Sequence, residues 1–124
     1  MVIEKHKGKL MKIAVVINKG CGECIFSKEA ELWVENHAHE YNAGVFYDIY
    51  DLPRHHPLLV DCVRELGKRV NGSRWSDIKV EYVCVDADDS FEYVIINKDN
   101  HEVIITKYHM KSVNLKESSS YVFI

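Results

Sequence analysis

The spacing of apolar residues predicts a strand and then a helix in the first third of the chain. Residues 12–18 are rich in Val and Ile and are typical of a buried strand. From Ser27, a favourable helix N-cap, apolar residues recur at helical spacing as far as Tyr41. Residues 42–44, Asn-Ala-Gly, are expected to end that helix, and residues 45–50 have the pattern of a second strand.

A second helical pattern begins at Pro57, which suits the first turn of a helix, and closes at Asn71-Gly72. Five apolar residues at helical spacing are expected to form its buried face: Leu59, Cys62, Val63, Leu66 and Val70. The residues between them are mostly charged, so this helix is expected to lie on the surface of a core with one face in water.

Three further strands are expected over residues 78–85, 91–97 and 101–108. Asp99-Asn100 between the last two is a tight hairpin signal, because Asn and Asp tolerate a positive φ. The order of elements predicts an α+β fold. In that fold two helices pack on one face of a mixed, mostly antiparallel sheet of about five strands.

The length of the chain and its apolar content indicate one domain, residues 1–124. At 47% apolar residues, it can build a core without help from a metal or a disulfide. Residues 1–10 are polar and basic and are expected to form a loose N-terminal arm. The tail, residues 111–124, ends in Tyr-Val-Phe-Ile, so we expect it to pack on the domain or on a second subunit.

The charge and the apolar runs exclude several partners. A formal net charge of −3 gives no general electrostatic reason to bind a nucleic acid polymer or an acidic membrane surface. The longest apolar run near the N-terminus, residues 13–17, is too short for a signal-peptide core or a membrane span. The sequence therefore predicts a cytoplasmic protein with no membrane partner.

Two polar loops open the predicted helices, and both contain residues suited to binding anions. One loop carries Gly20 and Gly22 before Phe26-Ser27-Lys28; the other carries Arg54, His55 and His56 before Pro57. Backbone N–H groups gather at a helix N-terminus, where the helix dipole favours negative charge. A guanidinium also forks onto phosphate oxygens. We therefore expect a phosphorylated ligand, although Arg54-His55-His56 could equally be a solvated loop.

For Arg54 in particular, we expect a phosphate contact. Its replacement by alanine should then weaken ligand binding and leave stability nearly unchanged. A large loss of stability would instead identify Arg54 as a partner in a structural ion pair.

The cysteines suggest two alternatives to ligand binding. Cys21 and Cys24 follow a predicted strand and precede a helix, which is the setting of a thioredoxin-like thiol oxidoreductase. That fold also needs a proline opening a later strand, and both prolines here precede a helix. A zinc site is the other alternative, but no spacing matches a known finger. Cys62 and Cys84 are interpreted as small core residues.

Tyr82, Tyr93 and Asn97 could present a sheet surface on which a nucleobase stacks, although both tyrosines could equally be core residues. The chain has no Ser-His-Asp arrangement, Walker loop or GxGxxG motif. We therefore expect no enzymatic activity, no cofactor and no metal site.

Two blocks of sequence carry a family resemblance. The first is Ile17-Asn18-Lys19, a glycine-bearing loop, then Phe26-Ser27 with Glu29-Ala30. The second contains three segments, Asp51–Arg54, Pro57–Val60 and Val63–Gly67, followed by Asn71-Gly72 and Ile78-Lys79-Val80. Together they resemble the phage anti-Thoeris sponge proteins, over roughly Met11 to His109. Those proteins sequester cyclic ADP-ribose isomers made by bacterial TIR-domain defence enzymes.

The resemblance implies a non-catalytic binder of a small cyclic nucleotide signal in the cytoplasm of the host cell. It also implies dimers, or trimers of dimers, with ligand pockets at subunit interfaces and separate sites for cyclic oligonucleotides. Together with the loops and the tyrosines, it leads to the following candidate ligand-binding residues: Gly22, Phe26, Ser27, Lys28, Arg54, His55, His56, Tyr82, Tyr93, Asn97, Lys107 and His109.

The chain departs from the family pattern in two places. Relatives carry a His–Arg pair near the end of the last strand, where this chain has Tyr108-His109 with Lys107 and Lys111 nearby. Any phosphate contact from that strand therefore passes to lysine or histidine. The first loop also has Cys21 and Cys24 where glycine or aromatic residues are commoner in the family.

Overall fold

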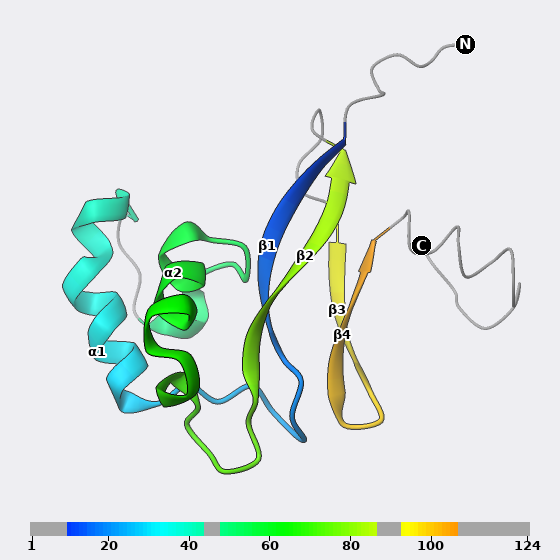
Figure 1. Ribbon diagram of the computed structural model, residues 1–124. Coiled ribbons are helices and arrows are strands. Elements are labelled where there is room, and N and C mark those ends of the chain that lie inside the picture. Colours follow the sequence, from blue (N-terminus) through cyan, green and yellow to red (C-terminus); the bar gives the residue numbers. More distant parts are fainter. Residues whose placement is uncertain (1–9, 44–47, 87–92, 107–124) are drawn as a thin grey trace, which may run out of the picture.

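The structure is a computed structural model that describes residues 10–43, 48–86 and 93–106. Its elements stack in three layers: a pair of helices, a two-stranded sheet, and a second two-stranded sheet (Figure 1). The helices are α1 (Lys28–His37) and α2 (Pro57–Leu66), and the strands are β1 (Leu10–Asn18), β2 (Ile78–Asp86), β3 (Tyr93–Lys98) and β4 (His101–Thr106).

The β1–β2 sheet is the middle layer, and apolar side chains cover it on both faces. The two strands are antiparallel, with Leu10 opposite Asp86 and Asn18 opposite Ile78. Val16 and Ile78 belong to the core under the helices. On the opposite face a second cluster joins the two sheets: Ile13, Val15, Ile17, Val85 and Ile104. Because successive residues of a strand face opposite sides, burial on both sides explains the unbroken apolar run of β1.

The expectation of a single sheet of about five strands is wrong. Among the described residues there are four strands, in two antiparallel pairs, β1 with β2 and β3 with β4. The α+β class and the two helices on one side are confirmed. The β3–β4 hairpin stacks on the apolar face of β1–β2 that the helices leave uncovered, and does not pair with an edge of that sheet. Stacking there removes the apolar face from water.

Each helix begins as the sequence predicted and ends in a tighter turn. The Ser27 hydroxyl caps α1 by accepting from the Ala30 N–H at 3.0 Å. After α1, residues Ala38–Tyr41 form a 3₁₀ turn that ends at Asn42, whose φ of 50° is left-handed. All five residues expected to bury the second helical face are buried, although the last, Val70, lies in a 3₁₀ turn, Gly67–Val70.

The strand expected over residues 45–50 is wrong at its end, and residues 44–47 lie outside the described residues. Ile49–Asp51 forms a 3₁₀ turn. The Asp48 carboxylate accepts from the Tyr50 N–H at 2.8 Å, and the Asp51 carboxylate accepts from the Asp48 N–H at 3.0 Å. This reciprocal capping box outweighs the strand preference of the aromatic and β-branched residues.

The final hairpin is confirmed over Tyr93–Lys98 and His101–Thr106, and the expected strand ends at 91–92 and 107–108 lie outside the described residues. Asp99 and Asn100 form its turn with φ of 54° and 68°, as a two-residue turn requires. The expectation that Cys84 is a core residue is wrong, because its side chain is exposed on β2, whereas Cys62 is buried as expected.

The predictions for the chain ends fall mostly on undescribed residues. Leu10, assigned to the N-terminal arm, is the first residue of β1, and the rest of that arm lies outside the described residues. The tail 111–124 lies outside them, as do Lys107 and His109. None of the described helices has the length and apolarity that a membrane span would need.

Candidate functional site

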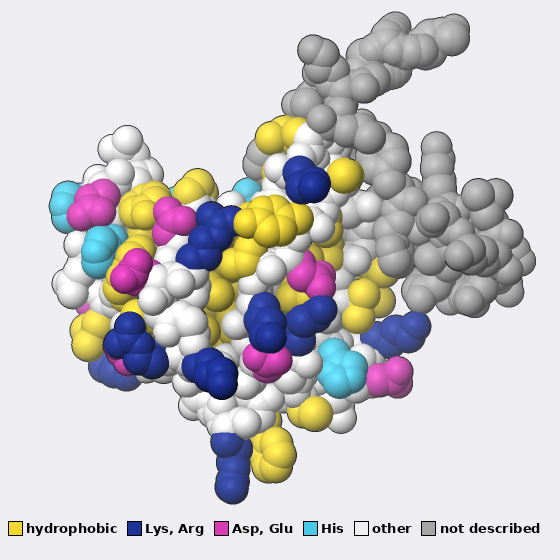
Figure 2. Space-filling model, viewed as in Figure 1, with side chains coloured by type: hydrophobic (Ala, Val, Ile, Leu, Met, Phe, Trp, Pro, Cys, Tyr) yellow, Lys and Arg dark blue, Asp and Glu magenta, His cyan; other side chains and the backbone are white. Residues whose placement is uncertain are grey.

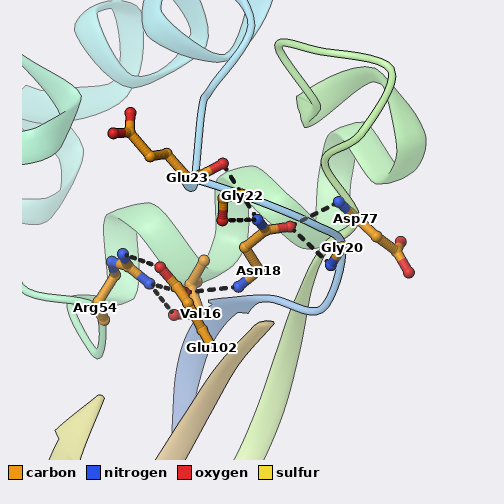
Figure 3. Close-up of polar contacts among 8 residues, drawn as sticks. All are labelled: Val16, Asn18, Gly20, Gly22, Glu23, Arg54, Asp77 and Glu102. Carbon is orange, nitrogen blue, oxygen red and sulfur yellow. Dashed lines mark hydrogen bonds and ion pairs between the residues drawn. The ribbon is translucent and has the colours of Figure 1, made fainter. Parts of the chain in front are cut away.

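The Arg54 guanidinium forms a two-pronged ion pair with Glu102 of β4. Its Nη1 and Nη2 donate to the two carboxylate oxygens at 2.8 and 3.0 Å (Figure 3). The side chains are only 27% and 10% exposed. Burial acts to raise the pKa of Glu102, but hydrogen bonds from Arg54 and from the Asn18 N–H hold it below its usual value. The guanidinium that we expected to bind phosphate therefore already binds a carboxylate.

Arg54 also covers the outer edge of β1. The Val16 N–H donates to the Arg54 carbonyl at 2.9 Å, and Arg54 Nη1 donates to the Val16 carbonyl at 3.0 Å. These contacts satisfy backbone groups that the edge strand would otherwise leave unpaired. Arg54 thus joins the loop before α2 to β1 and, through Glu102, to β4.

The Asn18 side chain organises the glycine-bearing loop after β1. It is completely buried, and its Nδ2 donates to the carbonyls of Gly22 and Glu23, both at 3.2 Å. Its Oδ1 accepts from the N–H groups of Gly20 and Asp77 at 3.0 and 2.8 Å (Figure 3). All four hydrogen-bonding positions of the side-chain amide are used, which fixes the orientation of the amide.

The four N–H groups from Lys19 to Gly22 donate within the chain and do not form an open anion cradle. Those of Lys19 and Cys21 donate to the carbonyls of Asp77 and Trp75, and that of Gly22 donates to the Asn100 carbonyl. A Cβ at Gly20 would lie 2.1 Å from the Trp75 carbonyl oxygen, so this close approach requires glycine. Gly20 thus serves packing against the 71–77 segment, whereas Gly22 has a φ of 83° and open space at its Cβ position.

The candidate ligand residues at the start of α1 make contacts within the chain. The Ser27 hydroxyl donates to the Arg69 carbonyl at 2.7 Å as well as capping the helix. Phe26 is buried, and Lys28 is exposed near Glu31. Because Arg69 follows the end of α2 and His56 precedes its beginning, the two loop–helix junctions lie at opposite ends of α2. One chain therefore does not bring them into a single site.

His55 and Tyr93 do come together, as two of the candidate ligand residues. His55 Nδ1 lies 2.8 Å from the Tyr93 hydroxyl, and the rings meet edge to face. Burial, with a smaller effect of His56, lowers the pKa of His55. His56 itself caps α2, because its Nδ1 accepts from the Leu58 N–H at 3.0 Å.

The lowered pKa of His55 predicts a loss of stability in mild acid. The unfolded chain takes up a proton at His55 near the ordinary value of 6.5, and the folded chain does so only at lower pH. The stabilising contribution of neutral His55 is therefore complete above pH 6.5 and is lost as the pH falls toward its folded pKa. Urea unfolding from pH 7.5 to 5 should show a shallower fall for His55→Gln than for the unchanged protein. Identical slopes would contradict this prediction.

His55 lines a groove between α2 and β1, called here the α2–β1 groove, with a volume of about 330 Å³. Its walls are the apolar Ala14, Pro57 and Val60 and the polar His55, Asp61 and Arg64. The Tyr41 hydroxyl donates to the Asp61 carboxylate at 2.7 Å, which raises the pKa of Tyr41 to about 12. The groove thus combines an apolar surface with an imidazole, a carboxylate and a guanidinium.

Tyr82, another candidate residue, lies on β2 beside Arg64. Its side chain is 56% exposed, Arg64 donates to its hydroxyl, and the guanidinium lies over its ring. Tyr82 is therefore a surface residue rather than a core one. Asn97 is exposed on β3, opposite Glu102, and no described contact joins it to Tyr82. The sheet platform of Tyr82, Tyr93 and Asn97 is divided between the two sheets.

Sequence reasoning missed Asp61 and Arg64 as possible site residues. They were placed on the wet face of the second helix, where charged residues are ordinary. Their spacing of three residues is the only local signal, since it puts both on one side of the helix, with 3.6 Å between their charged atoms.

The two thiols of the Cys21/Cys24 pair lie in different environments. Cys21 is exposed and Cys24 is buried, and both are free thiols. Burial, partly offset by the charge of Arg54, raises the pKa of Cys24 to about 11. This environment favours the protonated form of the Cys24 thiol.

The exposure of the thiols predicts their reactivity with a disulfide reagent such as Ellman's reagent. Cys21 and Cys84 are exposed and should react in the folded protein. Cys24 and Cys62 are buried, with pKa values raised to about 11 and about 12, and should react only after unfolding. The absorbance of the thiolate that the reagent releases, measured in buffer and in guanidinium chloride, separates the exposed thiols from the buried ones. Rapid reaction of Cys24 in the folded protein, shown by a Cys24→Ser variant, would contradict this assignment.

No group of three or more His, Cys, Asp or Glu residues among the described positions is placed to hold a metal ion. Comparison of the chain with protein-family models, with curated proteins and with solved structures finds no match.

Proposed function

We propose that the protein binds a cyclic ADP-ribose isomer without turning it over, and so blocks TIR-based antiphage defence by sequestration. The family resemblance suggests the ligand, and the α2–β1 groove is the observation that carries the proposal. The ligand consists of a base, riboses and a diphosphate, so its site needs an apolar surface, hydrogen-bonding groups and a cation.

The lining of the α2–β1 groove supplies each of these. Pro57 and Val60 offer apolar surface to a base. The Asp61 carboxylate is an acceptor for ribose hydroxyls, and Arg64 is a fork-shaped donor for phosphate oxygens.

We place the assembled site between subunits of a homo-oligomer. The groove is open, and Tyr82, which pairs with the lining residue Ala14 across the sheet, is exposed, so a second copy could cover this side. Light scattering at micromolar protein concentration should show a mass at least twice the 14.4 kDa of one chain. A particle of one chain in the presence of ligand would overturn the intersubunit site.

Sequestration is tested by following the ligand itself. We expect a cyclic ADP-ribose isomer to disappear from the ultrafiltrate when the protein is added in excess. After heat denaturation, chromatography should recover the ligand unchanged. New product peaks would identify an enzyme instead, and an unchanged ultrafiltrate would contradict binding.

A pair of variants tests the groove. Arg64→Ala removes its cation and should weaken binding by about tenfold or more, as loss of a charged hydrogen bond does. Arg74→Ala is the matched control, because the Arg74 guanidinium lies over the exposed Trp75 ring and does not line the groove. Equal weakening by both variants would show a general charge effect.

A further inference from the structure

A second groove lies between α2 and β2, called here the α2–β2 groove, with a volume of about 310 Å³. Val63 and Val80 contribute apolar surface, and three basic residues line it: Arg64, Lys68 and Lys79. Figure 2 shows Lys and Arg side chains gathered on this side of the molecule, over the region between α2 and β2. The positive charge is local, because the whole chain carries −3.

The three cations are only partly neutralised by described residues. Asp77 is the one acidic residue among the described lining, and its carboxylate lies 3.8 Å from Lys79 Nζ. Asp61 lies 3.6 Å from Arg64. No described acidic side chain forms an ion pair with Lys68, which is exposed. The groove thus keeps a positive rim above an apolar floor.

We propose that the α2–β2 groove is a binding site for the phosphate groups of a nucleoside diphosphate, held by Arg64, Lys68 and Lys79. The apolar floor faces the nucleoside, and the three cations face the phosphates. Lysine acts as a mobile point charge, whereas the guanidinium can fork onto two oxygens. The site does not depend on the proposed sequestration, although the two grooves share Arg64.

Isothermal titration with ADP and with adenosine tests the site. We expect ADP to bind at least about tenfold more tightly than adenosine, and its affinity to fall as NaCl is raised from about 50 to 200 mM. Equal binding of the two compounds, or no heat with ADP, would overturn the proposal.

Two double variants separate the groove from net charge. Lys68→Ala/Lys79→Ala should weaken ADP binding at least about tenfold. Lys12→Ala/Arg74→Ala removes two exposed cations that do not line the groove, and should change ADP affinity by less than about twofold. Equal weakening by both pairs would overturn the site. Lys68 and Lys79 do not line the α2–β1 groove. A negative result with ADP would therefore leave the proposed binding of cyclic ADP-ribose isomers to be judged by its own test.

Discussion

Glu102→Ala should lower the free energy of unfolding by about 2–4 kcal/mol, because it leaves the Arg54 guanidinium without its partner in a largely buried position. It also removes the acceptor of the Asn18 N–H at 2.8 Å. Arg54→Ala should cost a similar amount, since it strands the Glu102 carboxylate and uncovers the β1 edge at Val16. Urea unfolding at pH 7 measures both losses.

The matched control is Arg69→Ala. Arg69 also pairs with a glutamate, Glu29, at 2.6 Å, but the two side chains are 60% and 48% exposed. Its loss should cost less than about 1 kcal/mol. If Glu102→Ala cost no more than this control, the ion pair would be an ordinary surface contact. The expectation that Arg54→Ala leaves stability unchanged would then stand. A ligand-binding defect of Arg54→Ala must therefore be judged beside its stability.

Asn18→Asp should destabilise the fold by about 3–5 kcal/mol at pH 7, although it changes only one atom type. A carboxylate would direct an acceptor at the carbonyls of Gly22 and Glu23, where the amide nitrogen now donates. It would also bury a charge at a position with no exposure. Thermal and urea unfolding of this variant and of Asn18→Ala measure the loss.

The pH dependence identifies the cause of that loss. Protonation of the new carboxyl restores one donor, so the deficit of Asn18→Asp relative to the unchanged protein should shrink as the pH falls from 7 to 5. Asn36→Asp is the control, because Asn36 is exposed on α1 and the change there should stay within about 0.5 kcal/mol. A deficit for Asn18→Asp that is small, or that does not vary with pH, would mean that the loop does not depend on this amide.

Local sequence signals predicted the individual elements because their causes are local. Ser27 and Pro57 mark helix starts by capping and by a fixed φ, and Asp99-Asn100 marks the hairpin by tolerance of positive φ. The stacking of two sheets depends on residues far apart in the chain, such as Val15 and Ile104, which belong to one apolar cluster. An apolar run such as that of β1 is equally typical of a strand in a single covered sheet.

The candidate site was harder to predict than the fold, because side chains of the same type have different partners. Arg54 looked available for phosphate because its ion-pair partner, Glu102, lies in a distant strand. His55 and Tyr93 were both candidate residues, but nothing in their sequence positions indicated the contact between them. The basic residues Arg64, Lys68 and Lys79 come to line one groove through tertiary packing, and each looks ordinary in its own segment.

The pairing of β1 with β2 also sets the order in which the molecule is assembled. The nearest residues that pair, Asn18 and Ile78, enclose both helices in a closed loop of about sixty residues. During synthesis β1 emerges from the ribosome before β2. Until β2 has been synthesised, β1 has apolar residues on both faces and no pairing strand. The nascent chain therefore exposes an apolar, unpaired strand, which is the kind of segment that a chaperone binds.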